Sequence, residues 1–110
     1  MANGLDIAQL FSEMTGRFVP EHAEGITATV QFDLNGEDGG LYWLSIADKA
    51  CEHGAGAVEN ADMTLIANAE DYHALATGEL EPVKAFITGK LKVRGSMELA
   101  LRMQKIFQLI

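Results

Sequence analysis

Residues 76–107, ATGELEPVKAFITGKLKVRGSMELALRMQKIF, decide the fold that the sequence predicts. Pro82 fits the first turn of a short helix, and Gly89 ends that helix. Residues 90–94 then alternate basic and apolar side chains, which predicts an amphipathic strand. Ser96 is a good N-cap for a last, longer helix. The stretch therefore predicts a helix, a strand and a second helix in succession.

The residues before this stretch predict four more strands. Residues 26–34, ITATVQFDL, alternate apolar and polar side chains, so one face of that strand is expected to be buried. The turn NGEDGG at 35–40 connects it to a strand at 41–47 that is apolar on both faces. Residues 50–58 and 61–69 predict the third and fourth strands.

Helices are predicted before and after these four strands in the sequence. One helix is expected from about Asn3 to Arg17, and another opens at Asn68 and runs through Ala76. The order of elements predicts an α+β fold, with a five-stranded, largely antiparallel sheet and helices packed on one of its faces. We expect a single domain over residues 1–110.

The composition of the 110-residue chain narrows the classes of function. No apolar run approaches the roughly 18 residues that a membrane span requires, and the N-terminus has no basic region typical of a signal peptide. A single cysteine, Cys51, suits a reducing compartment, so we expect a cytoplasmic location. The formal net charge of -8 argues against binding to nucleic acid.

The last helix carries more apolar side chains than a helix needs to cover a sheet. Its broad apolar face includes Leu99 and Met103, yet Met97, Leu101 and Leu109 lie on the opposite arc. Leaving these side chains in water forgoes several kcal/mol, at about 1.5–3 kcal/mol for each. We therefore expect that a partner covers them or that they surround a cavity.

Several motifs resemble one family. Residues 76–107 are similar to the signature of the sterol carrier protein-2 (non-specific lipid-transfer, sterol-binding) domain family, with TGELxPxKAF, GKLKVxG and a Met-Gln-Lys-Ile-Phe close. Residues 26–50 resemble the first hairpin of that family, and residues 62–78 resemble its passage from strand to helix. The resemblance implies an apolar tunnel between sheet and helices that binds fatty acids, acyl-CoA, sterols or other lipids.

The resemblance also implies which residues contact the ligand. Carried over residue by residue, the tunnel lining is expected to comprise Phe32, Trp43, Leu75, Phe86, Ile87, Leu99 and Met103. Gln104 matches a position where the family commonly has Gln, and is expected to be a polar contact in an otherwise apolar tunnel.

The positive charge of the chain gathers at its C-terminal end. Residues 84–110 hold six of the eight cations and one of the sixteen anions. A lipid carrier must meet membranes, so one hypothesis is a patch that contacts anionic head groups or a membrane surface. The patch would comprise Lys84, Lys90, Lys92, Arg94, Arg102 and Lys105. The other interpretation is that these cations only balance the acidic remainder of the chain.

Two functions remain open at this point. The first is binding and intracellular carriage of a hydrophobic ligand in a tunnel beneath the last helix. The second is a module that forms homodimers, or docks on an enzyme, through the apolar last helix and has no lipid cargo. We expect no enzymatic activity, no cofactor and no metal, because the three histidines and Cys51 show neither ligand spacing nor a catalytic arrangement.

Overall fold

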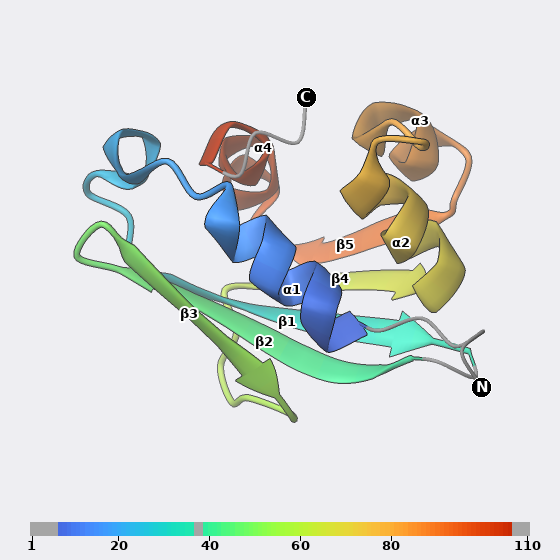
Figure 1. Ribbon diagram of the computed structural model, residues 1–110, viewed down its shortest axis with the longest axis horizontal. Helices are drawn as coiled ribbons and strands as arrows, with labels where there is room; N and C mark the ends of the chain where they lie inside the picture. Colours follow the sequence, from blue (N-terminus) through green and yellow to red (C-terminus); the bar gives the residue numbers. More distant parts are fainter. Residues whose placement is uncertain (1–6, 37–38, 107–110) are drawn as a thin grey trace.

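The structure is a computed structural model that describes residues 7–36 and 39–106 (Figure 1). Four α-helices, one 3₁₀ helix and five strands make up this part of the chain. In chain order they are α1 (Ile7–Gly16), η1 (Pro20–Ala23), β1 (Ala28–Asn35), β2 (Gly40–Ala47), β3 (Ala50–Ala55), β4 (Met63–Asn68), α2 (Ala69–Thr77), α3 (Pro82–Ile87), β5 (Leu91–Gly95) and α4 (Met97–Ile106).

The strands form one sheet in the order β3-β2-β1-β4-β5. Strand β4 runs parallel to β1, while the other neighbouring strands are antiparallel. The helices lie on one side of this sheet, as Figure 1 shows. The α+β fold with a largely antiparallel sheet, predicted from the order of elements, is therefore confirmed.

Strand register sends one set of apolar side chains toward the helices. Val30 of β1 lies between Leu44 of β2 and Met63 of β4, and all three are buried. Because side chains alternate along a strand, every second residue on these strands shares that face. The buried core therefore lies between the sheet and the helices.

Helix α1 docks on this face through an aromatic cluster. The ring of Phe11 meets the ring of Phe32 edge-on at 4.8 Å between centroids, and stacks on Tyr72 at 5.5 Å and Tyr42 at 5.1 Å. Phe11 itself is completely buried. Such contacts contribute about 0.5–1.5 kcal/mol each beyond the buried area, so the cluster fixes α1 over β1 and beside α2.

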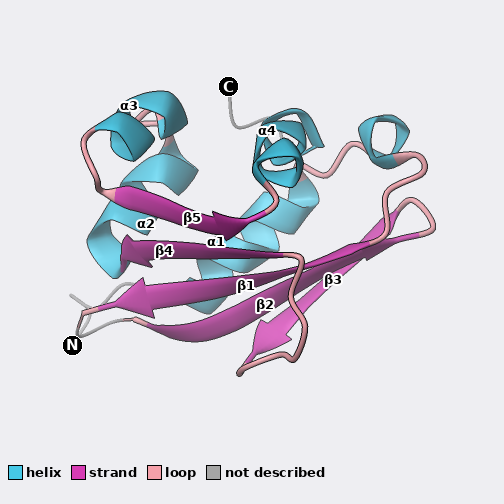
Figure 2. Ribbon diagram, turned by 180° about the vertical axis from the view of Figure 1, so that it is seen from behind, coloured by secondary structure: helices cyan, strands magenta, loops and turns pink. Residues whose placement is uncertain are grey.

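The segment between β3 and β4 crosses the other face of the sheet (Figure 2). Gln31 of β1 holds it there: its Nε2 donates to the carbonyl oxygens of Tyr42 at 2.7 Å and Gly56 at 3.1 Å, and its Oε1 accepts from the amide of Val58 at 2.8 Å. Further along, the amide of Asp62 donates to the Thr29 carbonyl at 2.8 Å. This crossing brings β4 back beside β1 in the parallel direction.

Two helix caps confirm predictions from the sequence. The Asn68 side chain accepts a hydrogen bond from the amide of Glu70 at 2.9 Å, and the Ser96 hydroxyl accepts one from Leu99 at 3.1 Å. The 3₁₀ helix η1 was not predicted. The predicted cap at Asn3 and the apolar Leu109 lie outside the described residues. None of the described helices has the length and hydropathy needed to cross a bilayer.

Replacing Gln31 with leucine should destabilise the protein. The change keeps an apolar stem but leaves the Val58 amide and the Gly56 carbonyl of the crossing, and the Tyr42 carbonyl of β2, without the Gln31 side chain as partner, at a cost of about 2–3 kcal/mol. Urea unfolding followed by circular dichroism measures the loss. Gln9→Ala, at an exposed position of α1, is the control, with an expected change within about 0.5 kcal/mol. Equal losses for both variants would contradict the assigned role of Gln31.

Candidate functional site

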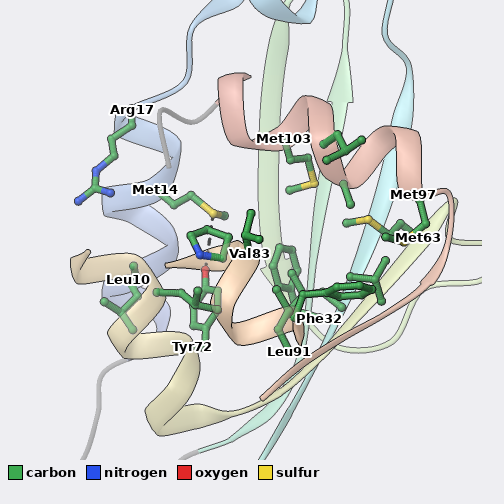
Figure 3. A pocket seen from close by; sticks show the side chains of 18 of the residues that line it. Leu10, Met14, Arg17, Phe32, Met63, Tyr72, Val83, Leu91, Met97 and Met103 are labelled. Atoms are coloured by element: carbon green, nitrogen blue, oxygen red, sulfur yellow. Dashed lines mark hydrogen bonds between the residues drawn. The ribbon is translucent and has the colours of Figure 1, made fainter. Parts of the chain in front are cut away.

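A cavity of about 290 Å³ lies between the sheet and the helices (Figure 3). Its floor is formed by side chains from the three strands β1, β4 and β5: Phe32, Met63, Leu65, Leu91 and Val93. Its walls come from all four α-helices. The space between the last helix and the sheet is thus not filled by the protein's own side chains.

Helix α1 supplies one wall. Leu10 and Met14 are four residues apart, so they lie on one side of the helix, and both line the cavity together with Arg17, which directly follows the helix. Glu13 lines it as well. Glu13 and Arg17 are the two charged residues of the lining; both are exposed, so they lie at an edge of the cavity.

Tyr72 of α2 is the buried polar residue of the lining. Its side chain is buried, and its hydroxyl donates a hydrogen bond of 3.6 Å to the sulfur of Met14 (Figure 3). Burial raises the pKa of this hydroxyl, and the nearby positive charge of Arg17 offsets only part of that rise. Tyr72 therefore stays a neutral phenol at physiological pH.

Four of the lining residues also reach the surface, at the rim formed by α3 and α4. The exposed fractions are 55% for Val83, 46% for Phe86, 45% for Met97 and 62% for Leu101. Large apolar side chains that line a cavity and also face solvent mark the way into it. Met97 and Leu101 are two of the surplus apolar residues of the last helix, and their contact with a cavity confirms one of the two explanations predicted for them.

The cavity brings together four of the residues that the family resemblance assigned to a tunnel. These are Phe32 on the floor, Leu75 of α2, Phe86 of α3 and Met103 of α4. They come from four different elements, so the fold alone makes them neighbours. A contact of any of them with a ligand stays a prediction.

Three predicted lining residues lie elsewhere. Trp43 pairs with Gln31 in the sheet and so points to the face opposite the helices, where its ring covers the glycine position at 54. Ile87 ends α3 and is 76% exposed, outside the cavity wall. Leu99 is buried in the core beside the cavity. The side chain of Gln104 lies outside the described part of the chain.

Sequence reasoning missed the wall supplied by α1 and Tyr72. The apolar stripe of the first helix predicted burial, but a stripe does not tell whether side chains meet a core or a cavity. A usable signal was the methionine content: Met14, Met63, Met97 and Met103 all line the cavity. Methionine fills irregular space and adapts to different neighbours.

The predicted basic patch is exposed but lies on two sides of the sheet. Lys84 of α3 and Lys90 are close in sequence to the rim residues of α3. Lys92 and Arg94 of β5 pair with Ile66 and Thr64, so their side chains point away from the helices. Arg102 forms an exposed ion pair with Glu98, at 3.7 Å between nitrogen and oxygen, and Lys105 is exposed.

Other reactive groups do not add chemistry to the site. Burial raises the pKa of the Cys51 thiol, which disfavours a reactive thiolate. The imidazole of His53 lies 5.9 Å from the ring of Phe11, between centroids, in a stacked arrangement. In residues 7–36 and 39–106, no three His, Cys, Asp or Glu side chains are grouped so that they could hold a metal.

The arrangement can shield an apolar molecule from water. Its volume is about twice that of a ~150 Å³ apolar cavity that binds benzene, and it lies near the lower end of the roughly 300–1,000 Å³ range of ligand pockets. Among the described residues that line it, Tyr72 has the one buried polar side chain, and the others supply apolar surface or lie exposed at the edge. Such a cavity suits a hydrophobic ligand.

The chain matches the model of a known protein family over most of its length. The sequence model of the SCP-2 sterol transfer family matches residues 11–108. Hydroxysteroid dehydrogenase-like protein 2 of Bos taurus is 38% identical over 80 residues, which cover 72% of this chain and 19% of that protein. The chain thus spans about a fifth of the length of the curated relatives that it matches.

Solved structures share the fold at low identity. The solution structure of palmitated SCP2L2 from Aedes aegypti has a TM-score of 0.76 at 16% identity, covering 94% of this chain and 95% of that one. The sec-alkylsulfatase Pisa1 from Pseudomonas sp. has a TM-score of 0.77 at 19% identity, covering 96% of this chain and 16% of that one.

Alkaline unfolding tests the environment of Tyr72. In the unfolded chain a tyrosine ionises near pH 10, whereas burial raises the pKa of Tyr72 in the folded protein. Above pH 10 the unfolded state binds fewer protons, so stability falls as the pH rises. Between about pH 9.5 and pH 11, Tyr72→Phe should lose about 1 kcal/mol less stability than the unmodified protein in urea unfolding. Equal losses would place the hydroxyl in water.

Proposed function

The chain belongs to the SCP-2 sterol transfer family, and we propose that it binds one hydrophobic molecule in its cavity and carries it between donor and acceptor. The cargo is a fatty acid, a fatty acyl-CoA, a sterol-like molecule or another lipid. The observation that supports this most directly is an apolar cavity whose rim at α3 and α4 opens to solvent.

Burial of the ligand is sufficient to explain affinity. Apolar surface removed from water contributes about 25 cal/mol per Å², so a few hundred Å² of ligand gives several kcal/mol. An apolar lining distinguishes one methylene more or less by only about 1–3 kcal/mol. We therefore propose carriage of a class of lipids without catalysis by this chain.

The names of the relatives support an apolar cargo. Segments similar to this chain occur within longer proteins named a hydroxysteroid dehydrogenase-like protein and a sec-alkylsulfatase, and the similar Aedes aegypti structure is of palmitated SCP2L2. We propose that the cavity of this chain holds molecules of the same apolar kind. The alternative of a dimerising or docking module without cargo has no support from these comparisons. The cytoplasmic location stays a prediction.

We further propose that cargo enters and leaves at an anionic membrane surface, with the α3–α4 rim facing the bilayer. Phe86 and Leu101 would reach the lipid, while Lys84 and Lys90 contact head groups. Charge supports this choice, because the chain is acidic overall yet has Lys84 and Lys90, both exposed, close in sequence to the rim residues Val83 and Phe86. Each basic residue near such a surface contributes about 1 kcal/mol.

Filling the cavity should weaken lipid binding. Ala100 of α4 lines the cavity, and Ala100→Trp places an indole where the cargo would lie. The delipidated variant should bind cis-parinaric acid at least about tenfold more weakly than the unmodified protein, a difference of about 1.4 kcal/mol, in a fluorescence titration.

The matched control is Ala57→Trp, which adds the same side chain at an exposed position outside the cavity. It should bind as the unmodified protein does. Native mass spectrometry of protein from its own host, followed by extraction, identifies the class of cargo. Unchanged uptake by folded Ala100→Trp would refute the cavity as the binding site.

Charge reversal tests the membrane proposal. The double change Lys84→Glu and Lys90→Glu should weaken binding to vesicles of phosphatidylserine and phosphatidylcholine by roughly tenfold or more at low salt. Binding to pure phosphatidylcholine should not change. Lys49→Glu, at the β2–β3 turn, is the control and should bind as before. Equal binding by all three proteins in a sedimentation assay would exclude docking through these lysines.

A further inference from the structure

We propose that the Tyr72 hydroxyl is the polar anchor of the cavity, and that it selects lipids whose polar end is an uncharged oxygen, a hydroxyl or a carbonyl. The inference rests on the proposed function, because it assumes that a lipid enters this cavity. It adds the residue that orients the lipid and the chemical class of its polar end.

The position of the hydroxyl supports the first part. Tyr72 is 5% exposed and lines the cavity. Its hydroxyl donates to the sulfur of Met14 at 3.6 Å, and this is its hydrogen-bond partner among the described residues. A thioether is a weak acceptor, so the phenol keeps most of its hydrogen-bonding capacity. Figure 3 shows the hydroxyl pointing toward Met14, among the apolar lining side chains.

A ligand oxygen can therefore replace the Met14 sulfur at little cost. Buried polar groups are nearly always paired, and an oxygen acceptor gives a stronger bond than a thioether. The phenol ring need not move, because it is held by stacking on Phe11 and by an edge contact with Phe32. The Met14 side chain, flexible and apolar, can turn away.

The charges around the hydroxyl support the second part. Glu13 and Arg17, the charged residues of the lining, have opposite signs and lie exposed at the edge of the cavity. Arg17 is the cation near Tyr72, but it is exposed to water, so an ionised carboxylate buried beside Tyr72 would lose its hydration without a buried cation as partner. An uncharged hydroxyl or carbonyl loses far less hydration, and the neutral phenol can donate to either.

The test compares ligands that differ only at one end. 1-Tetradecanol, tetradecane and tetradecanoate compete with an uncharged probe, the methyl ester of cis-parinaric acid, for the delipidated protein and for Tyr72→Phe. Each result is corrected for the affinity of the probe. The unmodified protein should prefer tetradecanol over tetradecane by about fivefold, as expected for one net hydrogen bond. In Tyr72→Phe this preference should disappear, while the affinity for tetradecane stays the same.

The control is Tyr42→Phe. Tyr42 also stacks on Phe11, at 5.1 Å between centroids, but it does not line the cavity, so its hydroxyl should not affect the preference. The proposal is overturned if Tyr72→Phe keeps the preference for the alcohol, if it weakens alcohol and alkane equally, or if tetradecanoate binds more tightly than tetradecanol. Failure of every ligand to bind the unmodified protein would instead refute the proposed function.

Discussion

The hydrogen bonds of Gln31 hold the crossing that brings β4 beside β1. They hold the segment after β3 against the outer face of the sheet, so the chain passes β2 and β1 before it forms β4. Only after that crossing do Met63 and Leu65 lie beside Phe32. The floor of the cavity therefore depends on a polar side chain that points away from it.

The helices form the walls of the cavity above the sheet. Phe11 locks α1 over β1, and Tyr72 of α2 packs on the same ring, so these two helices form a fixed side of the cavity. The opposite side differs, because α3 and α4 present Val83, Phe86 and Leu101 partly to solvent. One half of the wall thus holds its shape through aromatic packing, and the other half forms the entrance.

The sequence predicted the elements well because alternation and caps are local properties. The strand expected at 26–34 is Ala28–Asn35, and the caps at Asn68 and Ser96 are present. What the sequence could not give depends on long-range pairing. Residues 41–47 are apolar on both faces, so nothing in them tells which of two neighbouring aromatics faces the helices. Pairing with β1 puts Tyr42 with Phe32 and sends Trp43 to the far face.

The same limit applied to the site. Phe32 and Met103 could be assigned to the cavity because the family resemblance covers them, whereas the wall from α1 lies in the part of the chain that the resemblance did not reach. Leu99 and Met103 lie on one broad face of the last helix, yet only Met103 lines the cavity. A helical wheel separates buried from exposed positions, but it does not divide buried positions between packed protein and open space.

Because of the cavity between the sheet and the helices, the stability of this protein depends on whether a ligand is bound. Side chains that line an unfilled space lose the dispersion contacts that a packed neighbour would supply. The ligand-free protein is therefore less stable than the protein with a ligand in the cavity. A guest at a hundred times its dissociation constant adds about 2.7 kcal/mol to the free energy of unfolding. The melting temperature thus reports the fraction of protein that holds a ligand, and the ligand-bound protein should resist heat and proteolysis longer than the ligand-free protein.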